Sequence, residues 1–248
     1  MMNNLAASHG SNVTSMQLLI SIISGWGTTY NPTPDAIKLP ALQALYTSGG
    51  NAVKAVDNLM PDYLKVKNER DVLFDPLNTL TTRVMNAFIS IVKNPAARTN
   101  VRSLVNLVQT GRVNPKKKKA PVVDPAAEPQ TDNSNESHKS GFSVRIDNFY
   151  KLIQLLASFP AYAPNEPELT VTSLGTLYDS MVAKNQIVID HEIPLKKARD
   201  ARNAILYDPI TGLVEAGQDA KSYIKSVFGA QSTQQKQVSK IKFAMYNH

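Results

Sequence analysis

The chain has 248 residues, 42% hydrophobic and 19% charged, which is enough apolar material to bury a substantial core in one or two domains. It contains no cysteine, which excludes disulfides, thiolate catalysis and cysteine-ligated zinc. The net charge of +7 divides into +4 over residues 1–113, +1 over 114–141 and +2 over 142–248. Apart from one lysine run, this distribution lacks the concentrated positive face of a dedicated nucleic-acid binder.

The first predicted helix contains an apolar stretch, MQLLISII at residues 16–23, that is far too short to span a bilayer. No Lys or Arg precedes Lys38, whereas a secretory signal needs positive charge ahead of its apolar segment. We therefore expect a buried first helix and no membrane association. We interpret Trp26 and Tyr30, which follow the stretch, as plugs at the helix end rather than as a platform for stacking bases.

Two octamers, LFDPLNTL at 73–80 and LYDPITGL at 206–213, are identical at four of their positions. Two shorter pairs recur at almost the same offset: YNP at 30–32 with YAP at 162–164, and LQALY at 42–46 with LGTLY at 174–178. Three matches in the same order predict an internal duplication, with copies near 14–110 and 146–244. The period is too long for a solenoid, so each copy is a whole helical unit.

The octamers predict a joint between two helices. Asp75 and Asp208 have the side chain of a good N-cap, because a carboxylate accepts hydrogen bonds from the free N–H groups of a first helical turn. Pro76 and Pro209 would then occupy the first helical position, where the missing N–H has no cost. One capping residue explains both copies, so this interpretation is preferred to a catalytic aspartate.

Apolar residues recur at helical spacing on either side of the joints. The stripes in the second copy are Ile146, Phe149, Ile153 and Leu156, then Leu213, Ala216, Ala220, Ile224 and Val227. The first copy matches the latter stripe with Leu77, Leu80, Val84, Phe88 and Ile91. Each copy is expected to close with a short helix, at 99–108 and at 232–241. Breaks between the second and third helices are expected at Gly49-Gly50 and Pro61, and at Pro194.

These elements predict an all-α fold, a tandem duplication of a four- to five-helix bundle unit with a pseudo-two-fold relation. The first helical repeat is predicted at residues 1–112 and the second at 142–248. Residues 113–141 are rich in Pro, Ser, Asn, Lys and acids with almost no apolar pattern. Such a composition cannot offset its ordering entropy, so we expect a flexible Lys/Pro-rich linker.

Candidate anion-binding residues form two groups. The linker run PKKKK contains Lys116, Lys117, Lys118 and Lys119, which resemble an import signal or a phosphate contact but are more simply a solvated tether. The closing helices each carry a basic pair four residues apart, which shares a helix face: Arg98 with Arg102, and Lys236 with Lys240. Lys221, Lys225 and Lys242 add to the second pair. The simpler interpretation is the solvated side of amphipathic helices.

Motifs for catalysis, metals or cofactors are absent from the sequence. It has no Glu-x-x-His pair for a di-iron bundle, and none of the glycine-rich phosphate, dinucleotide or nucleophile-elbow patterns. Of four histidines, only His191 falls in a region expected to be ordered, and Asp190-His191-Glu192 is interpreted as a loop or a helix start. We therefore predict no catalytic, metal or cofactor-binding residues.

The segment KSYIKSVFGAQSTQQKQVSKIKF at 221–243 resembles the C-terminal signature of an uncharacterised family of bacterial all-helical proteins. Its marks are an aromatic-Gly turn, a Ser and then Lys-Gln-Val. The first copy lacks the Phe-Gly pair in IVKNPAARTNVRSLV at 91–105. The resemblance implies a helical fold and a bacterial, cytosolic setting, and it implies no activity.

The sequence therefore leads to a non-enzymatic helical interaction or structural module that binds a protein partner or itself. Two alternatives remain open. One is a weak nucleic-acid or polyanion binder that uses the linker lysines and the closing helices. The other is an enzyme with an unrecognised site between the repeats.

Overall fold

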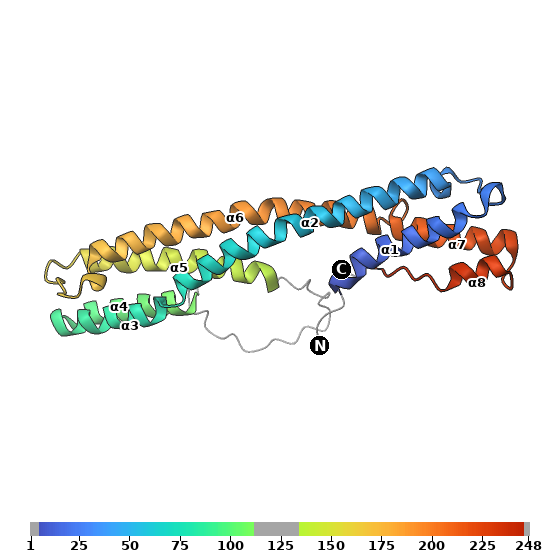
Figure 1. The fold of residues 1–248 in the computed structure, drawn as a ribbon. Coiled ribbons are helices and arrows are strands. Elements are labelled where there is room, and N and C mark those ends of the chain that lie inside the picture. The colour runs from blue at the N-terminus through green and yellow to red at the C-terminus, as the bar shows by residue number, and fades with distance from the viewer. Residues whose placement is uncertain (1–4, 112–133, 246–248) are drawn as a thin grey trace, which may run out of the picture. The chain divides into compact units, whose positions relative to one another are not determined.

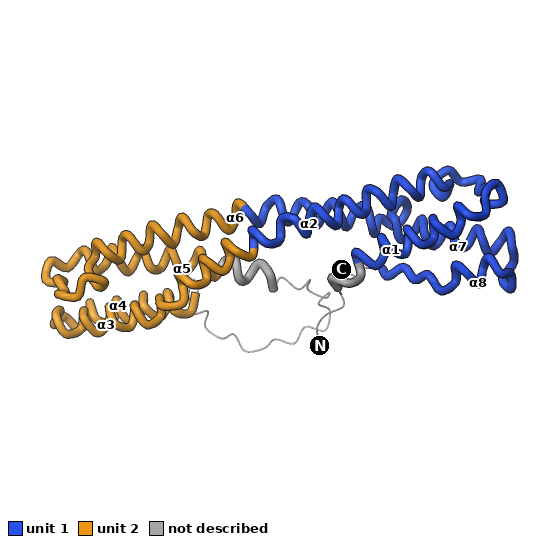
Figure 2. The backbone as a smooth tube through the Cα atoms, in the orientation of Figure 1, with its two compact units in different colours: residues 1–63, 191–248 blue, residues 64–190 orange. Residues whose placement is uncertain are grey.

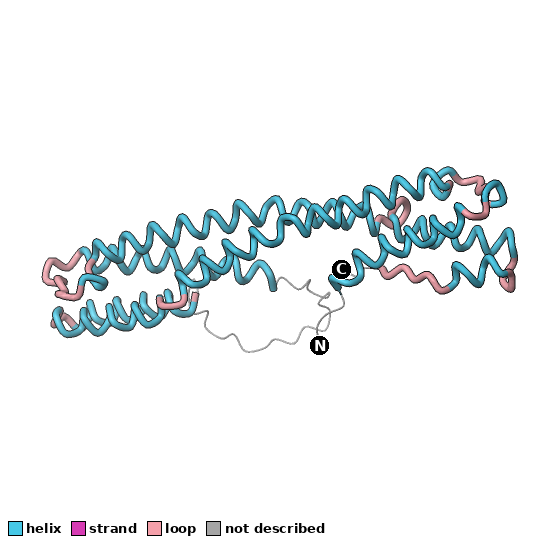
Figure 3. The backbone as a smooth tube through the Cα atoms, viewed as in Figure 1, coloured by secondary structure: helices cyan, strands magenta, loops and turns pink. Residues whose placement is uncertain are grey.

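The computed structural model describes residues 5–111 and 134–245, and Figure 1 shows its helices in chain order. Within these ranges the chain is helical and contains no strand, which confirms the predicted all-α class (Figure 3). The elements are α1 Leu5–Ser24, η1 Gly27–Thr29, η2 Asp35–Ile37, α2 Leu39–Phe74, α3 Leu77–Ile91, α4 Pro95–Thr110, α5 Ser134–Ala157, η3 Pro167–Leu169, α6 Val171–Tyr207, α7 Leu213–Phe228 and α8 Thr233–Ser239.

The chain forms two compact units, coloured separately in Figure 2. Unit 1 combines residues 1–63 with 191–248, and unit 2 consists of residues 64–190. These bounds do not coincide with the predicted repeats at 1–112 and 142–248, because each unit takes helices from both repeats. The long helices α2 and α6, with 36 and 37 residues, contribute to both units.

Unit 1 is built around α7, which packs against α1, α8 and η2, while α1 also contacts α8. The helices meet because each has a stripe of apolar residues at helical spacing. The buried core residues come from α1, α2, α6, α7, α8 and the segments beside them: Met16, Leu19, Ile23, Tyr30, Ile37, Leu42, Leu206, Leu213, Ala216, Ala220, Ile224, Val238 and Ile241.

Unit 2 is built around α4, which packs against α5 and α3, while α3 contacts η3. Its core contains the predicted stripe of α5 together with residues of α2, α3, α4 and α6: Phe74, Leu77, Val84, Phe88, Val101, Val105, Val108, Ile146, Phe149, Leu152, Ile153, Leu156, Leu174 and Met181. The predicted α7 stripe is buried in unit 1 except for Val227, which is 49% exposed.

The predicted breaks at Gly49-Gly50, Pro61 and Pro194 are wrong, because α2 and α6 continue through them. Asp190-His191-Glu192 likewise lies inside α6 and is neither a loop nor a helix start. A proline removes one backbone donor from a helix. In helices as long as α2 and α6, many other backbone hydrogen bonds and buried residues remain to hold the segment.

Gly49 has a packing role inside α2. A Cβ at this position would lie 2.9 Å from Leu213 Cδ1 and 3.1 Å from Leu206 Cδ2. Glycine therefore marks a close approach of α2 to the core of unit 1, and not a break in the helix.

The predicted N-caps Asp75 and Asp208 are also wrong. The helix α3 begins at Leu77 with Pro76 as N-cap and has no side-chain cap. Asp208 Oδ1 does accept hydrogen bonds from the N–H groups of Ile210 and Thr211, at 3.0 and 2.7 Å, but these belong to a turn before α7. The N-cap of α7 is Gly212, which comes after that turn. The two octamers thus form joints of different length.

The predicted linker at 113–141 overlaps the described chain at its end only. Residues 134–141 belong to α5, so this part is helical. The first buried residue of the α5 stripe is Ile146, whereas the helix itself begins at Ser134, so the apolar pattern does not mark the start of the helix. Residues 113–133, with Lys116, Lys117, Lys118 and Lys119, lie outside the described residues.

Candidate anion-binding pocket between α7 and α8

A polar pocket of about 480 Å³ lies between α7, α8 and the residues that follow α8; we call it the α7–α8 pocket. Its lining consists of Gln218, Lys221, Ser222, Lys225, Gln235, Ser239, Ile241, Lys242 and Phe243. The three lysines carry positive charge at neutral pH, and no Asp or Glu is among the lining residues. The pocket therefore presents a positively charged surface to a ligand.

The helix α7 turns its polar face to the pocket because the core of unit 1 takes its apolar face. Its buried residues are Leu213, Val214, Ala216, Gly217, Ala220 and Ile224. The lining residues Gln218, Lys221, Ser222 and Lys225 fall at spacings of three, one and three, which places them on one side of a helix. The same register that builds the core thus brings Lys221 and Lys225 together.

The second wall is the short helix α8, whose start is fixed by two local features. Gly229 follows the last residue of α7 with a φ of 86°, a conformation that favours glycine and lets the chain turn back. Ser232 is the N-cap of α8, and its hydroxyl oxygen accepts from the N–H of Gln235 at 3.0 Å. Val238 is buried in the core, and Gln235 and Ser239 line the pocket.

The segment after α8 is held against unit 1 at two places. The ring of Phe243 packs on Gly217, where a Cβ would clash with three ring atoms. The buried side chain of Asn12 binds the backbone of Ala244 twice: Nδ2 donates to the carbonyl oxygen and Oδ1 accepts from the N–H, both at 2.8 Å. These contacts fix the backbone directly after Lys242, which therefore has a defined place at the pocket.

Lys221 is the best-positioned cation of the pocket. Its Nζ donates to the carbonyl oxygen of Ile241 at 2.5 Å, which leaves two further N–H groups available to a ligand. Partial burial lowers the pKa of Lys221, since desolvation disfavours the charged form. An anionic ligand beside Lys221 would raise this pKa again, because a nearby negative charge favours the ammonium form. Lys225 and Lys242 are exposed, so their ammonium groups reach the pocket from solvent.

Gln235 supplies an acceptor. Its Oε1 is buried and, within the described part of the chain, accepts no hydrogen bond. Buried polar atoms are usually paired, and an unpaired one costs about 1–3 kcal/mol. The pocket therefore combines cations for an anion with one acceptor for a hydroxyl or amine group. A hydrogen phosphate or a hydroxy acid has both functions.

The two basic pairs predicted from the sequence, Arg98 with Arg102 and Lys236 with Lys240, have different neighbours in the structure. Arg98 is engaged by the backbone, because Nε donates to Val92 O at 2.7 Å and Nη2 donates to Ile89 O at 2.6 Å, which satisfies the end of α3. Arg102 is exposed on α4. Lys236 on α8 and Lys240 directly after it are exposed and do not line the α7–α8 pocket. The first pair thus has one member bound to the backbone, whereas both members of the second pair are exposed.

Lys221, Lys225 and Lys242 were predicted only as additions to the pair Lys236 and Lys240, although the sequence carries a clear signal for them. Residues 220–248 contain no Asp or Glu and five lysines: Lys221, Lys225, Lys236, Lys240 and Lys242. Charge counted over 142–248 hides this segment, because the acids at 147–219 offset it. A count over single helices would have found it.

Among the residues that the structure describes, no three His, Asp or Glu side chains lie together as metal ligands. None of the described helices combines the length and the apolar character that crossing a membrane requires.

No protein-family model matches the chain, and comparison with curated proteins and with solved structures finds no similar protein. The resemblance of residues 221–243 to a bacterial helical family is therefore untested and stays a prediction.

Proposed function

We propose that this protein is a non-enzymatic helical binding module whose α7–α8 pocket binds an anionic group that also carries a hydrogen-bond donor. The observation that carries the proposal is the convergence of Lys221, Lys225 and Lys242 on a pocket without a carboxylate, beside the unpaired Gln235 Oε1. Hydrogen bonds from ammonium to an oxyanion are about twice as strong as neutral ones. The lining has no paired carboxylates or Ser–His pair, so it favours binding over catalysis.

The anionic group is a phosphate or a carboxylate, either free or on a side chain of a protein partner. If the group belongs to a protein partner, the protein is an interaction module. Its partner is then another protein or a second copy of the chain, in a cytosolic setting. A duplicated architecture with a pseudo-two-fold relation is part of the same proposal. It is supported by the matched order of contacts: α3 with α4 and η3 in unit 2, and α7 with α8 and η2 in unit 1.

Aromatic pairs beside the long helices support the duplication further. In unit 1 the rings of His9 and Tyr207 have centroids 5.6 Å apart, and in unit 2 those of Phe142 and Phe74 are 4.8 Å apart. The offset from His9 to Phe142 equals the offset from Phe74 to Tyr207, and it is also the offset between the two octamers. Each pair joins a residue of one predicted repeat to a residue of the other.

The test is a titration of the full ¹⁵N-labelled chain, followed by amide chemical shifts. Hydrogen phosphate replaces chloride stepwise while the ionic strength is kept constant. In a second titration a short phosphoserine peptide is added instead. We expect saturable shifts of the Gln235 side-chain amide and of the backbone at Ser222 and Lys225. Tighter binding of the peptide than of phosphate would assign the group to a protein partner.

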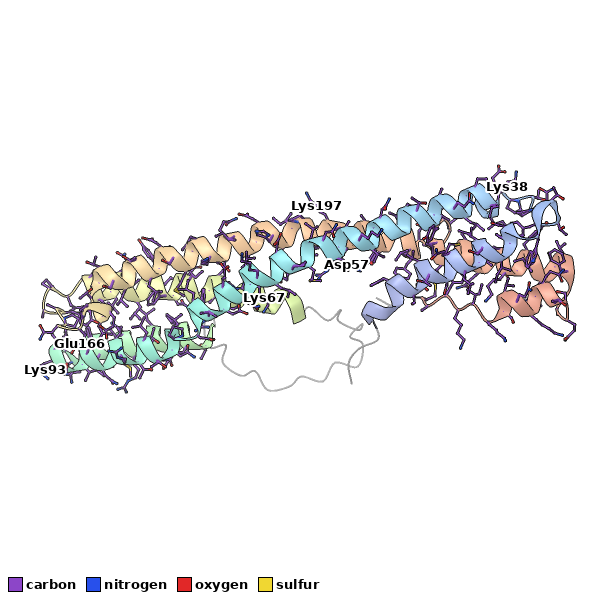
Figure 4. The ribbon with its side chains drawn as sticks, viewed as in Figure 1. Lys38, Asp57, Lys67, Lys93, Glu166 and Lys197 are labelled. Carbon is purple, nitrogen blue, oxygen red and sulfur yellow. The ribbon has the colours of Figure 1, made fainter. Side chains whose placement is uncertain are left out.

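Two variants make the test specific. Lys225→Met with Lys242→Met removes two cations and should abolish the shifts. Lys197→Met is the matched control, since Lys197 is an exposed lysine that projects from α6 and does not line the pocket (Figure 4). Shifts that never saturate, or equal losses in both variants, would overturn the proposal.

A second candidate function, weak binding of nucleic acid or another polyanion, is favoured by the acid-free segment at 220–248. Phosphate contacts alone give dissociation constants of about 10⁻⁴–10⁻⁶ M that weaken steeply with salt. Anisotropy of a labelled DNA duplex across a salt series measures this directly. Binding that depends on Lys225 and Lys242 and falls steeply with salt would favour the second candidate over a discrete anion.

A further inference from the structure

A second hollow lies beside α8 and shares only Ser239 with the lining of the α7–α8 pocket. It has a volume of about 840 Å³ and lies between the end of α1 and α8 in unit 1. We call it the Trp26 hollow. Its lining residues are Ile22, Gly25, Trp26, Thr233, Lys236, Gln237, Ser239 and Lys240. Most small-molecule sites have volumes of about 300–1,000 Å³ and are mainly apolar with a few polar groups.

Trp26 is held in place as one wall of this hollow. Its backbone N–H donates to Ile23 O at 3.1 Å at the end of α1, and its ring centroid lies 5.4 Å from that of Phe228 at a tilt of 60°. Gly27 follows with a φ of 56°, so the chain turns away directly after the indole. Tyr30, by contrast, is buried. Trp26 is only half-buried and remains in contact with the hollow.

The opposite wall supplies the charge. Lys236 lies on α8 and Lys240 is its C-cap residue, still in the helical conformation, so these two residues four apart share a face. Both are exposed, and no ion pair between described residues includes either of them. No Asp or Glu lines the hollow. The two ammonium groups are therefore available to an anion whose remainder lies on Trp26 and Ile22.

We propose that the Trp26 hollow binds an organic acid with one carboxylate and an aromatic or aliphatic body. The body packs on the indole and on Ile22, where burial of apolar surface drives binding. The carboxylate lies between Lys236 and Lys240. A bare phosphate fits this hollow poorly because it would leave the apolar wall uncovered, and it suits the polar α7–α8 pocket instead. The inference does not depend on the function proposed for that pocket.

The chain offers a built-in reporter, because Trp26 is its only tryptophan. The experiment uses the full chain and two probes, 8-anilinonaphthalene-1-sulfonate and decanoate. Excitation of the indole should sensitise emission of the bound naphthalene dye, with saturation near one equivalent. Decanoate should displace the dye, whereas decanol, which has the same chain without the charge, should displace it much less well.

Variants assign the binding to this hollow. Lys236→Ala with Lys240→Ala should weaken decanoate binding about three- to tenfold, the range for two exposed ion pairs, and should leave decanol unchanged. Lys225→Ala with Lys242→Ala removes the same charge from the α7–α8 pocket and should have no effect. Trp26→Phe keeps an aromatic wall and should abolish the sensitised emission while directly excited dye still binds.

Three results would overturn the inference: dye emission that the indole does not sensitise, equal competition by decanoate and decanol, or equal losses in the two lysine pairs. Circular dichroism of each variant establishes that it is folded. The phosphate titration of the α7–α8 pocket is carried out on the same variants. A variant that loses phosphate binding but keeps decanoate binding, or the reverse, shows that the two ligands bind at separate sites.

Discussion

The hydroxyls of Tyr30 and Tyr162, which occupy matching positions in the two predicted copies, make the same hydrogen bond in different units. Tyr30 Oη donates to Ile37 O at 2.7 Å, and Tyr162 Oη donates to Leu169 O at 2.9 Å. Both rings are buried, and each acceptor is the last residue of a short 3₁₀ turn, η2 or η3. Each bond therefore holds the loop that leads into a long helix.

Removal of either hydroxyl should destabilise the protein to a similar extent. Tyr30→Phe and Tyr162→Phe each lose one buried hydrogen bond, which costs about 0.5–1.5 kcal/mol. Urea unfolding followed by circular dichroism measures the loss. Tyr150→Phe is the control, since this tyrosine is 45% exposed and should unfold like the parent. A loss at one of the two buried positions only would show that the loops are held differently.

Alkaline pH should weaken the same bonds. Burial raises the pKa of Tyr162 to about 12, above its ordinary value of 10.0, and it raises the pKa of Tyr30 as well. The unfolded chain then loses the phenol protons first, so their contribution to stability is complete below pH 10 and is lost as the pH rises towards 12. Unfolding free energies in this window should fall less steeply for Tyr162→Phe than for the parent.

Mild acid should destabilise unit 1 through His9. Burial lowers the pKa of His9 from 6.5, the charge of Arg202 lowers it further, and Asp57 opposes this. The unfolded chain therefore takes up the proton first, and stability declines as the pH falls below 6.5. Its Nδ1 lies 2.7 Å from Tyr207 Oη. His9→Phe with Tyr207→Phe reproduces the aromatic pair of unit 2 and should flatten the unfolding free energy between about pH 7 and pH 5.

A cut between the predicted repeats should leave the two halves together. Each compact unit contains helices from before residue 112 and from after residue 133, so neither half contains a complete unit. A specific protease site inserted between these residues tests this, with size-exclusion chromatography of the cleaved chain. We expect one peak at the mass of the intact protein, and two peaks only after denaturation. Separation of the two halves in native buffer would contradict the finding that each unit contains helices from both predicted repeats.

Two adjacent glycines in α2 should respond oppositely to alanine. At Gly49 a Cβ would press on the buried side chains of Leu213 and Leu206, whereas at Gly50 the nearest atom, Val13 Cγ1, is at 3.7 Å, an ordinary contact. Alanine favours a helix over glycine by about 0.5–1 kcal/mol, so Gly50→Ala should stabilise. Overpacking costs about 1–3 kcal/mol, so Gly49→Ala should be the less stable variant in thermal unfolding.

The helices could be predicted because their signal is local. A stripe such as Ile146, Phe149, Ile153 and Leu156 identifies a buried face, and all four residues are buried. The stripe does not say which helix covers it. The pairing of α5 with α4, and of α1 with α7 and α8, depends on contacts between segments that are separated in the chain, most widely in unit 1. This is why the predicted repeats and the compact units differ.

The candidate site was predictable in part. The lysines of 220–248 stand out by charge alone, yet their division between two hollows depends on how α8 is oriented by the buried Val238. The unpaired Gln235 Oε1 has no sequence signature, because any glutamine near a helix N-cap looks the same. Arg98 was named for its charge, but the structure uses it to satisfy the end of α3.

The order of the two units along the chain has a consequence for synthesis on the ribosome. Unit 2 is one continuous segment, residues 64–190, so all of its helices have been made before the last part of the chain is translated. Unit 1 is discontinuous, and its first segment, 1–63, must wait for α7 and α8. Domains generally fold as units in the order in which they are completed. The apolar faces of α1 and of the start of α2 are therefore the surfaces exposed longest in the nascent chain, where a chaperone would be needed most.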